Sequence, residues 1–346
     1  MTKKILQITL SLLIAGFFIW LSLKEIDAGD VYNQIKSVKL GWLLLFVPLT
    51  LFSHFLRGLR WELLLAREKI QPSKLTLFTG VILGYFMNLV FPRLGEVSRP
   101  VYVARKMDVS SGMMIGTILL ERLIDLLFLI LLFYIVVFTL VGDPEVLSGV
   151  FGRESLPSGL LLGIALATLI LPLGLLLLFR FSRALSARFV IPAGATQEDI
   201  PLFMRLMRKV FDLIESFSNG ILSIRYVPNW PLFIGYSLLI WVCYILMMLI
   251  PFGMLDFGPT YGLGHKEATI VTMISSIGIV IPTPAGIGTY HLFVQQALYQ
   301  LYSIPLVDGL TFATVTHGMT VIIILVTAPI LLWIDKNRKG ISTKSS

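Results

Sequence analysis

The stretch IGIVIPTPAGIGTYH, residues 277–291, decides how this chain is folded. It lies in an apolar segment long enough to enter a lipid bilayer, yet it holds Pro282, Pro284, Gly286 and Gly288 within seven residues. Proline removes a backbone hydrogen-bond donor, and glycine weakens a helix by about 1 kcal/mol relative to alanine. A helix that faces lipid has no other partner for the freed backbone groups. We therefore expect a broken segment whose break is buried in protein or lines a wet cavity.

An earlier stretch, MNLVFPRLGEVSR at residues 87–99, looks like a counterpart of this break. It ends an apolar run that contains Gly80 and Gly84, and it stops that run at Pro92. Arg93, Glu96 and Arg99 follow at once. The two stretches raise the question of whether the chain holds a pair of broken segments.

Composition places the chain in a membrane. Of its 346 residues 56% are hydrophobic and 14% are charged, and the mean hydropathy is +0.86. Soluble domains carry roughly 25% charged residues. We therefore expect an all-α integral membrane protein, with residues 1–346 forming a single polytopic membrane domain.

Charge and cysteine content narrow the function further. The net charge of +8 fits cationic cytoplasmic loops and contact with anionic lipid, so we expect no nucleic-acid partner. Cys243 is the one cysteine, and the sequence holds no Cys/His metal cluster. We find no nucleotide-binding, zinc or serine-hydrolase motif. We therefore expect no metal, no cofactor and no ATP-driven transport by this chain alone.

Hydrophobic runs predict six full membrane helices, over residues 5–23, 40–56, 113–141, 158–179, 230–250 and 310–333. The first run follows Lys3 and Lys4, but it is longer than a typical ~7–15-residue signal core and no small-x-small cleavage site follows it. We expect it to be a retained helix. Residues 200–219 show helical periodicity with arginines off the apolar face, which predicts an amphipathic helix on the cytoplasmic surface.

The cationic loops predict the path of the chain across the membrane. Short loops rich in Lys and Arg stay cytoplasmic, and residues 57–74, 93–112 and 180–230 carry five, four and seven such cations. The first two loops share a side only if the segment between them enters and leaves from the cytoplasm. We therefore predict re-entrant segments at about 75–99, from the inside, and 268–304, from the outside, arranged as an inverted repeat. The alternative is a simple bundle of eight spans.

Several charged residues near the inner face are candidates for a site. Arg57 and Arg60 come just after the second predicted helix, beside Trp61. They either anchor the topology, with Trp61 in the aromatic belt at the membrane interface, or bind a phosphate head group, to which arginine can donate two hydrogen bonds. The first break forms either a binding site or a structural knot of salt bridges, through Asn88, Arg93, Glu96 and Arg99.

Glu121, Arg122 and Asp125 lie deep in the fourth predicted helix. At 1.5 Å per residue they stand roughly 12–18 Å from its start. Glu121 and Asp125 are one turn apart and share a face. Polar groups at such depth usually face the bundle interior and mark a functional site; the alternative is that they only neutralise Arg93 or Arg99.

The second break offers backbone groups and one imidazole. Amides freed around Gly286 and Gly288 suit an anion at the start of a half-helix. Thr283 and Tyr290 flank these glycines. His291 is either a proton-coupled switch or a hydrogen-bonded structural residue. We expect His54 and His317 to be structural.

Four motifs in order resemble the flippase domain of lysylphosphatidylglycerol synthetases and the stand-alone, uncharacterised membrane proteins related to it. They are R-x-x-R-W (57–61), N-x-x-x-P-R-x-G-E-x-x-R (88–99), E-R-x-x-D (121–125) and P-x-G-x-G (284–288). The likeness spans nearly the whole chain. This chain departs from the usual late motif, P-G-G-[LI]-G-x-x-E, because Ala285 replaces the glycine that follows the proline and His291 replaces the glutamate. These departures bear on any role carried over to those positions.

The resemblance implies translocation of a polar lipid, which is anionic, aminoacylated or polyprenyl-linked, across a prokaryotic-type plasma membrane. Both termini are expected in the cytoplasm. It implies no lysyl-lipid synthesis here, because that chemistry belongs to a separate soluble domain. Membrane lipids are the expected partner; a lipid-modifying enzyme and a second copy of the chain are further candidates. Two other functions stay open: a polyprenyl-phosphate phosphatase or lipid phosphotransferase, using Ser98 or His291, and a proton- or ion-coupled small-solute transporter.

Overall fold

A computed structural model describes residues 2–24, 26–66, 71–141 and 222–338, together with Gly163 and Leu166. All regular structure in this part of the chain is helical. The elements are α1 (Thr2–Leu23), α2 (Ala28–Lys36), η1 (Leu40–Trp42), α3 (Leu43–Leu64), α4 (Lys74–Val90), α5 (Gly95–Met107), α6 (Ser111–Val141), η3 (Ser223–Tyr226), α10 (Trp230–Met254), α11 (Phe257–Tyr261), α12 (His265–Val280), η4 (Pro284–Gly286), α13 (Thr289–Tyr302) and α14 (Leu306–Asn337).

Three helices of the described chain are long and apolar enough to cross a membrane. They cover Leu40–Leu64, Trp230–Met254 and Leu306–Asn337, with mean hydropathies of 1.5, 2.3 and 2.1. Leu44, Val242 and Ile322 are among the large apolar side chains that these helices expose, as lipid-facing residues would be. The expected membrane protein is confirmed at this level.

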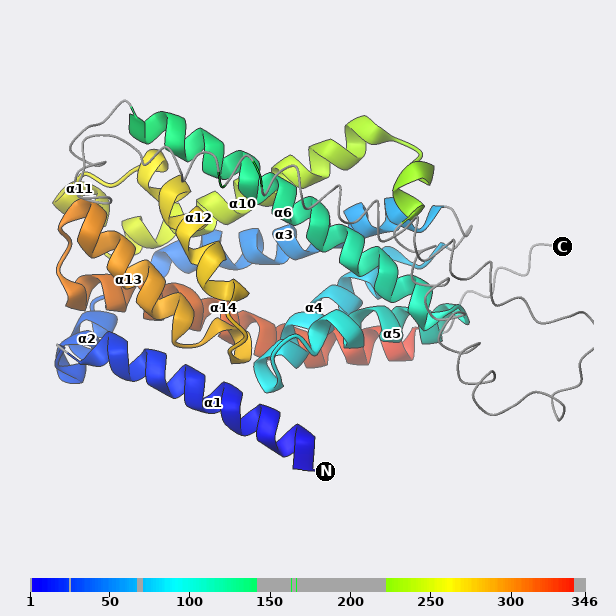
Figure 1. Ribbon diagram of the computed structural model, residues 1–346, viewed down its shortest axis with the longest axis horizontal. Helices are drawn as coiled ribbons and strands as arrows, with labels where there is room; N and C mark the ends of the chain where they lie inside the picture. The colour runs from blue at the N-terminus through cyan, green and yellow to red at the C-terminus, as the bar shows by residue number, and fades with distance from the viewer. Residues whose placement is uncertain are drawn as a thin grey trace, which may run out of the picture.

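The first predicted break is a helical hairpin made of α4 and α5 (Figure 1). Its two helices touch at a pair of glycines: a Cβ atom on Gly95 would lie 2.0 Å from the backbone oxygen of Gly84. Asn88 closes the turn, because its Oδ1 accepts the Gly95 N–H at 2.7 Å. Arg93 has a left-handed φ of 61° in the same turn. Backbone contact at small residues therefore holds the hairpin shut.

The second predicted break is also a hairpin, in which α12 runs into η4 and returns as α13. Ala285, Gly286 and Gly288 adopt φ angles of 52°, 79° and 85°, which end one helix and start the next. The tip is tied by Thr289, whose hydroxyl donates to the Gly286 oxygen at 3.1 Å. A Cβ on Gly288 would lie 2.5 Å from the Ala15 oxygen, so α1 packs directly on the break.

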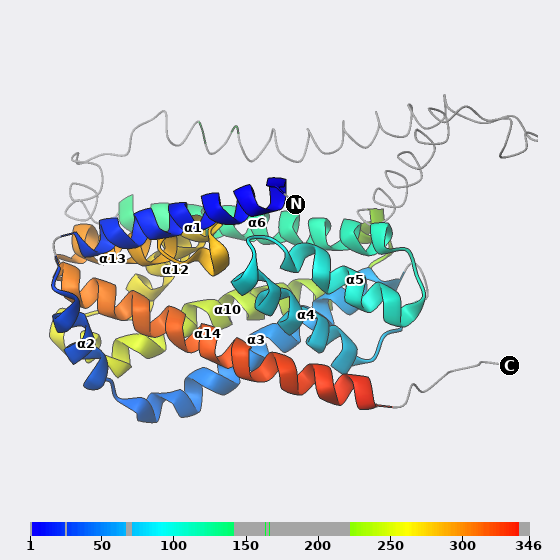
Figure 2. The same cartoon turned by 90° about the horizontal axis from the view of Figure 1, so that it is seen from below.

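Helix α14 packs against both hairpins. The α4–α5 hairpin begins and ends near the last turns of α14, and the α12–α13 hairpin begins and ends near its first turn. At its last turns Asp335 accepts from Thr76 of α4 and Tyr102 of α5. At its first turn Asp308 accepts from Tyr261, just before α12, and α13 ends at Tyr302, just before α14. The tips point toward each other (Figure 1), and η4 packs against α4. Helix α14 runs along both hairpins (Figure 2).

Several predicted boundaries need correction. The second helix does not end at residue 56: α3 continues to Leu64, so the predicted basic loop begins inside a helix. The first hairpin closes at Met107 rather than at residue 99, and the second begins at His265 rather than at residue 268. The predicted helices over 158–179 and 200–219 lie outside the described residues, apart from Gly163 and Leu166.

Candidate functional site

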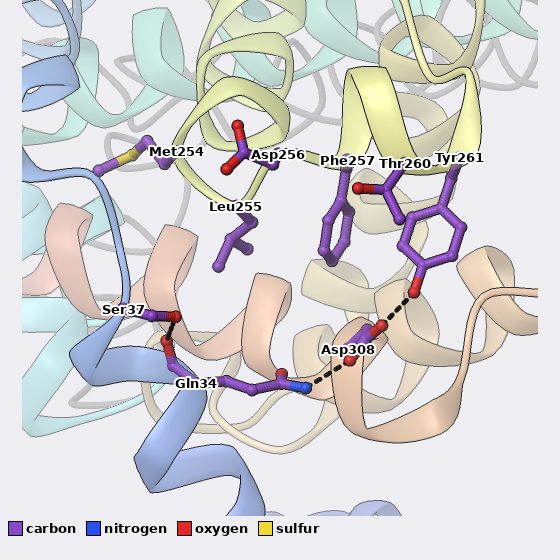
Figure 3. A pocket seen from close by; sticks show the side chains of 9 residues that line it. All are labelled: Gln34, Ser37, Met254, Leu255, Asp256, Phe257, Thr260, Tyr261 and Asp308. Atoms are coloured by element: carbon purple, nitrogen blue, oxygen red, sulfur yellow. Dashed lines mark hydrogen bonds between the residues drawn. The ribbon is translucent and has the colours of Figure 1, made fainter.

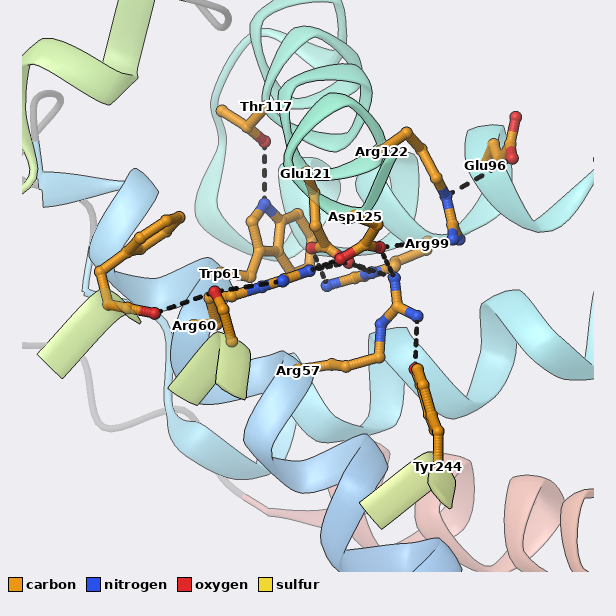
Figure 4. Close-up of polar contacts among 12 residues, drawn as sticks. Arg57, Arg60, Trp61, Glu96, Arg99, Thr117, Glu121, Arg122, Asp125 and Tyr244 are labelled. Carbon is orange, nitrogen blue, oxygen red and sulfur yellow. Dashed lines mark hydrogen bonds and ion pairs between the residues drawn. The ribbon is translucent and has the colours of Figure 1, made fainter. Parts of the chain in front are cut away.

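Three arginines and two acids from three helices meet inside the protein (Figure 4). We call these residues the arginine cluster: Arg57 and Arg60 of α3, Arg99 of α5, and Glu121 and Asp125 of α6. Helical spacing accounts for the arrangement. Arg57 and Arg60 are three residues apart, and Glu121 and Asp125 are four apart, so each pair shares one helix face.

Glu121 is the centre of the cluster. Its two oxygens accept two hydrogen bonds from Arg99, both 3.0 Å long, and its Oε1 accepts a third from Arg57 at 2.6 Å. Arg60 stands 3.5 Å from the same oxygen. One carboxylate thus joins α3, α5 and α6.

Asp125 holds the two arginines of α3 together. Its Oδ2 accepts from Arg57 at 3.0 Å, and its Oδ1 accepts from Arg60 at 2.6 Å. Tyr85 and Tyr244 each accept a 2.9 Å hydrogen bond from Nη1 of Arg57. Helices α4 and α10 therefore also contribute polar groups to the cluster.

Trp61 is not an interfacial anchor, as one interpretation of the sequence held. It is fully buried, and its indole N–H donates to Thr117 at 2.8 Å. The guanidinium of Arg99 lies 4.3 Å from the centre of its ring, within the range of a cation–π contact. Trp61 therefore packs against Arg99, which also pairs with Glu121.

The cluster holds more positive than negative charge. Arg57, Arg60 and Arg99 are at most 4% exposed, and Glu121 is fully buried. Three guanidiniums facing two carboxylates leave an excess of one positive charge. Removing ions from water costs several kcal/mol each, so a buried surplus charge is costly unless a counter-ion can reach it.

Arg122 and Glu96 form a looser and more open edge of the cluster. Nε of Arg122 stands 3.6 Å from Glu96 Oε1, and its Nη1 stands 3.7 Å from Asp125 Oδ2. The side chains of Arg122 and Glu96 are 38% and 41% exposed, against 18% for Asp125. Arg122 and Glu96 are therefore the most exposed of the charged residues joined at the cluster.

The other residues predicted for a site at the first break are either structural or exposed. Asn88 fixes the hairpin turn, and Arg93 is exposed in that turn. The interpretation that the acids of α6 only neutralise arginines holds in part, because Glu121 pairs with Arg99. The same acids also pair with Arg57 and Arg60 of α3, which that interpretation did not include.

The predicted residues of the second break lie together at the tip of the α12–α13 hairpin. The hydroxyls of Thr283 and Thr289 are 3.1 Å apart, and Tyr290 is buried with its hydroxyl 3.7 Å from the sulfur of Met248. His291 Nδ1 accepts the Gly288 N–H at 3.4 Å. His291 also stacks on His317 of α14, with ring centres 5.0 Å apart. Sequence reasoning took His317 as structural, and it missed this pairing.

A cavity that the sequence did not indicate lies at the start of α14 (Figure 3). It measures about 290 Å³, and Asp256, Tyr261 and Asp308 contribute to its polar lining. Burial raises the pKa of Tyr261 to about 12, so its hydroxyl keeps its proton and donates to Asp308. Within the described residues, no group of three or more His, Cys, Asp or Glu side chains is placed to hold a metal ion.

One of three comparisons with known proteins finds a match. Neither the curated proteins nor the solved structures contain a match to the chain. Residues 8–328 match the family described as the lysylphosphatidylglycerol synthase TM region. That match covers nearly the whole sequence, including every residue of the arginine cluster and both hairpins, and this chain therefore belongs to the lysylphosphatidylglycerol synthase transmembrane-region family.

Proposed function

We propose that this protein moves a polar lipid with an anionic head group between membrane leaflets. The observation that carries the proposal is the arginine cluster, which is buried, holds one surplus positive charge and opens at Arg122. Arginine is suited to phosphate because its planar donors form two parallel hydrogen bonds with it. Anionic, aminoacylated and polyprenyl-linked lipids all present such a phosphate.

The loose ion pair between Arg122 and Glu96 gives the head group a place to enter. A phosphate that replaces Glu96 at Arg122 gains a cation whose present contacts are 3.6 and 3.7 Å long. The surplus charge of the cluster behind Arg122 attracts the same phosphate. Charge attraction is strong there because little water screens it. The acyl tails stay in lipid while the head group crosses.

We also propose that the two hairpins are re-entrant and related as an inverted pair. At 1.5 Å per residue, α5 and α13 are about 20 and 21 Å long, which is less than the ~30 Å hydrocarbon core. Each hairpin returns to the end of α14 from which it started. Two broken elements that meet at the midplane from opposite faces are typical of secondary transporters.

The orientation that fits the cationic loops places both termini in the cytoplasm of a prokaryotic-type cell. The α4–α5 hairpin then enters from the cytoplasmic side, and the α12–α13 hairpin enters from outside. Lys106 and Asp335 pair at 2.6 Å and would lie at the inner interface. The arginine cluster would serve a head group arriving from the inner leaflet.

The geometry favours transport over phosphatase chemistry. A serine nucleophile needs a base within hydrogen-bond reach. The Ser98 hydroxyl is buried without a hydrogen-bond partner among the described residues, and Arg99 beside it is bound to Glu121. His291, the other nucleophile considered, accepts a backbone N–H and stacks on His317.

The substitution Arg122→Ala tests the proposal. In proteoliposomes of phosphatidylethanolamine and phosphatidylglycerol, we expect it to slow translocation of fluorescent (NBD-labelled) phosphatidylglycerol roughly tenfold or more, because charged hydrogen bonds contribute about 1.5–3 kcal/mol. Arg105→Ala is the matched control, since it removes the same charge from an exposed position of α5. Both variants should keep the wild-type unfolding temperature.

Two results would count against the proposal. Translocation by Arg122→Ala at the wild-type rate would remove Arg122 from the head-group path. Equal losses in both arginine variants would show that net charge, and not this position, sets the rate.

A further inference from the structure

The imidazoles of His291 and His317 stack on each other, and both residues are partly exposed. His317 comes eleven residues after the first residue of α14, about 17 Å along the helix at 1.5 Å per residue. His291 lies in the first turn of α13, just after the break. Ionisable groups at such depth are rare, and they mark ion paths and proton relays.

The contacts of the pair make His291 sensitive to a single proton. The Gly288 N–H donates to His291 Nδ1, so that nitrogen carries no proton in this structure. Protonation at Nδ1 turns this acceptor into a donor. The amide of Gly288 then loses its partner, at the point where α13 begins and where α1 packs on the break.

The aromatic ring that contacts both imidazoles is uncharged. Tyr290 meets His317 edge to face at 5.2 Å and His291 at 5.9 Å. Stacking of the two imidazoles at 5.0 Å means that a second proton would have to approach the first closely. The arrangement therefore suits one proton per pair.

Charged groups of the packed helices stand away from the pair along the chain. On α14 the charges are Asp308, Asp335 and Lys336, near its two ends; α13 and α10 have none. The other neighbours carry theirs near helix starts or at the hairpin tip: Lys3 and Lys4 of α1, Lys74 of α4, Lys266 and Glu267 beside His265 in the first turn of α12, and the exposed Arg93 before α5. The titratable side chain that contacts both rings is the Tyr290 phenol.

We infer that His291 is a proton-binding site that couples proton uptake to opening of the α12–α13 hairpin. In the closed form shown here the pair is neutral and the Gly288 N–H is bound. Opening brings water to the break, His291 Nδ1 takes a proton from that water, and the freed Gly288 amide donates to water instead. The inference rests on the proposed lipid transport only in taking this opening as one step of the transport cycle.

The size of the effect follows from linkage. An imidazole in water has a pKa of about 6.5, so lowering the pH from 7.5 to 5.5 stabilises a protonatable open state about tenfold over a closed state that excludes the proton. Two independent imidazoles would give a much steeper response. The expected change is therefore a tenfold rise in opening, set by one proton.

Hydrogen exchange measures this opening without moving any lipid. The full chain in nanodiscs would be compared at pH 7.5 and 5.5, following the backbone amides of residues 283–292 and correcting for the intrinsic pH dependence of exchange. We expect the wild type to open about tenfold more at pH 5.5. His291→Gln should lose the response, because glutamine keeps an acceptor for the Gly288 N–H but does not titrate.

Two further variants serve as controls. His317→Phe keeps an aromatic ring on His291 and should keep the tenfold response. His265→Gln removes an exposed imidazole in the first turn of α12 and should behave like the wild type. A wild-type response close to one, or a tenfold response that survives His291→Gln, would overturn the inference.

The lipid assay separates failure of this inference from failure of the proposed function. Translocation of short-chain NBD-labelled phosphatidylglycerol, followed by extraction with albumin, would be compared at the same two pH values. Lipid movement that is equal at both values rejects proton coupling and leaves lipid transport standing. A pH-dependent opening in a protein that moves no lipid supports the proton site and counts against lipid transport.

Discussion

The two hairpins have the same shape and different chemistry. The α4–α5 hairpin contributes Arg99 to a charged network, where Glu121 joins three helices. The α12–α13 hairpin presents backbone groups, two hydroxyls and the imidazole of His291, which stacks on His317 of α14. Charge joins the first hairpin to its neighbouring helices, whereas left-handed turns and a capping imidazole shape the second. In the proposed function, the first hairpin belongs to the head-group site and the second is the element that opens.

Removing the carboxylate of Glu121 should have the largest effect on stability. Glu121→Gln leaves three buried guanidiniums with one full carboxylate, and breaking a buried ion pair from one side costs about 3–5 kcal/mol. Chemical unfolding in detergent micelles should show that loss in the free energy of unfolding. Glu96→Gln, at the exposed edge, should lose less than about 1 kcal/mol. Equal stability of the two variants would refute the central role of Glu121.

Disturbing the contact between Gly84 and Gly95 in the first hairpin should have the second largest effect on stability. Gly95→Ala places a methyl group 2.0 Å from the Gly84 oxygen, so α4 and α5 must separate, at a cost of about 3 kcal/mol. Gly318→Ala adds the same methyl group to α14, where no atom lies within 4 Å, and should be nearly neutral. Thermal unfolding of both proteins checks the difference. A stable Gly95→Ala protein would mean that the helices do not touch there.

Replacing the Arg99 guanidinium by the ammonium of lysine should have the third largest effect on stability. Arg99→Lys keeps the charge but loses the two-bond contact with Glu121 and the planar contact with Trp61. We expect a loss of about 2 kcal/mol, since a hydrogen bond to a charged group contributes about 1.5–3 kcal/mol. Chemical unfolding should show that loss, whereas Arg105→Lys on the exposed face of the same helix should leave the curve unchanged.

Removing the Tyr244 hydroxyl, which joins α10 to the cluster, should have the smallest effect on stability. Tyr244→Phe removes one neutral acceptor from Arg57, which costs about 1 kcal/mol. Tyr85 accepts from the same nitrogen, so the double variant with Tyr85→Phe should lose more than the sum of the two single losses. Strict additivity would show that the two hydroxyls act independently.

Much of the fold was predictable because it depends on local hydropathy and on proline and glycine. The spans α3, α10 and α14 and both hairpins follow from such patterns. Arg57 and Arg60 were placed outside the second helix because arginine lowers hydropathy, which predicted a helix end at residue 56. Their partners Glu121 and Asp125 lie on a distant helix, and no local signal in α3 indicates them.

The composition of the site was predictable in part. The four-residue spacing of Glu121 and Asp125 correctly indicated one polar face on α6. Tyr85 and Tyr244, which complete the arginine cluster, and His317, which pairs with His291, come from three other helices. Nothing in their own neighbourhoods distinguishes them from core residues. Only the packing of α10 and α14 against the hairpins brings them into place.

The central claim is that the arginine cluster binds an anionic lipid head group through Arg122. Native mass spectrometry of the purified protein, released from detergent after expression in a bacterium, tests it directly. The account predicts that the wild type and Arg105→Ala retain a co-purified phosphate-bearing lipid and that Arg122→Ala loses it. Equal lipid occupancy in all three proteins, or a wild type that carries no anionic lipid, would contradict it.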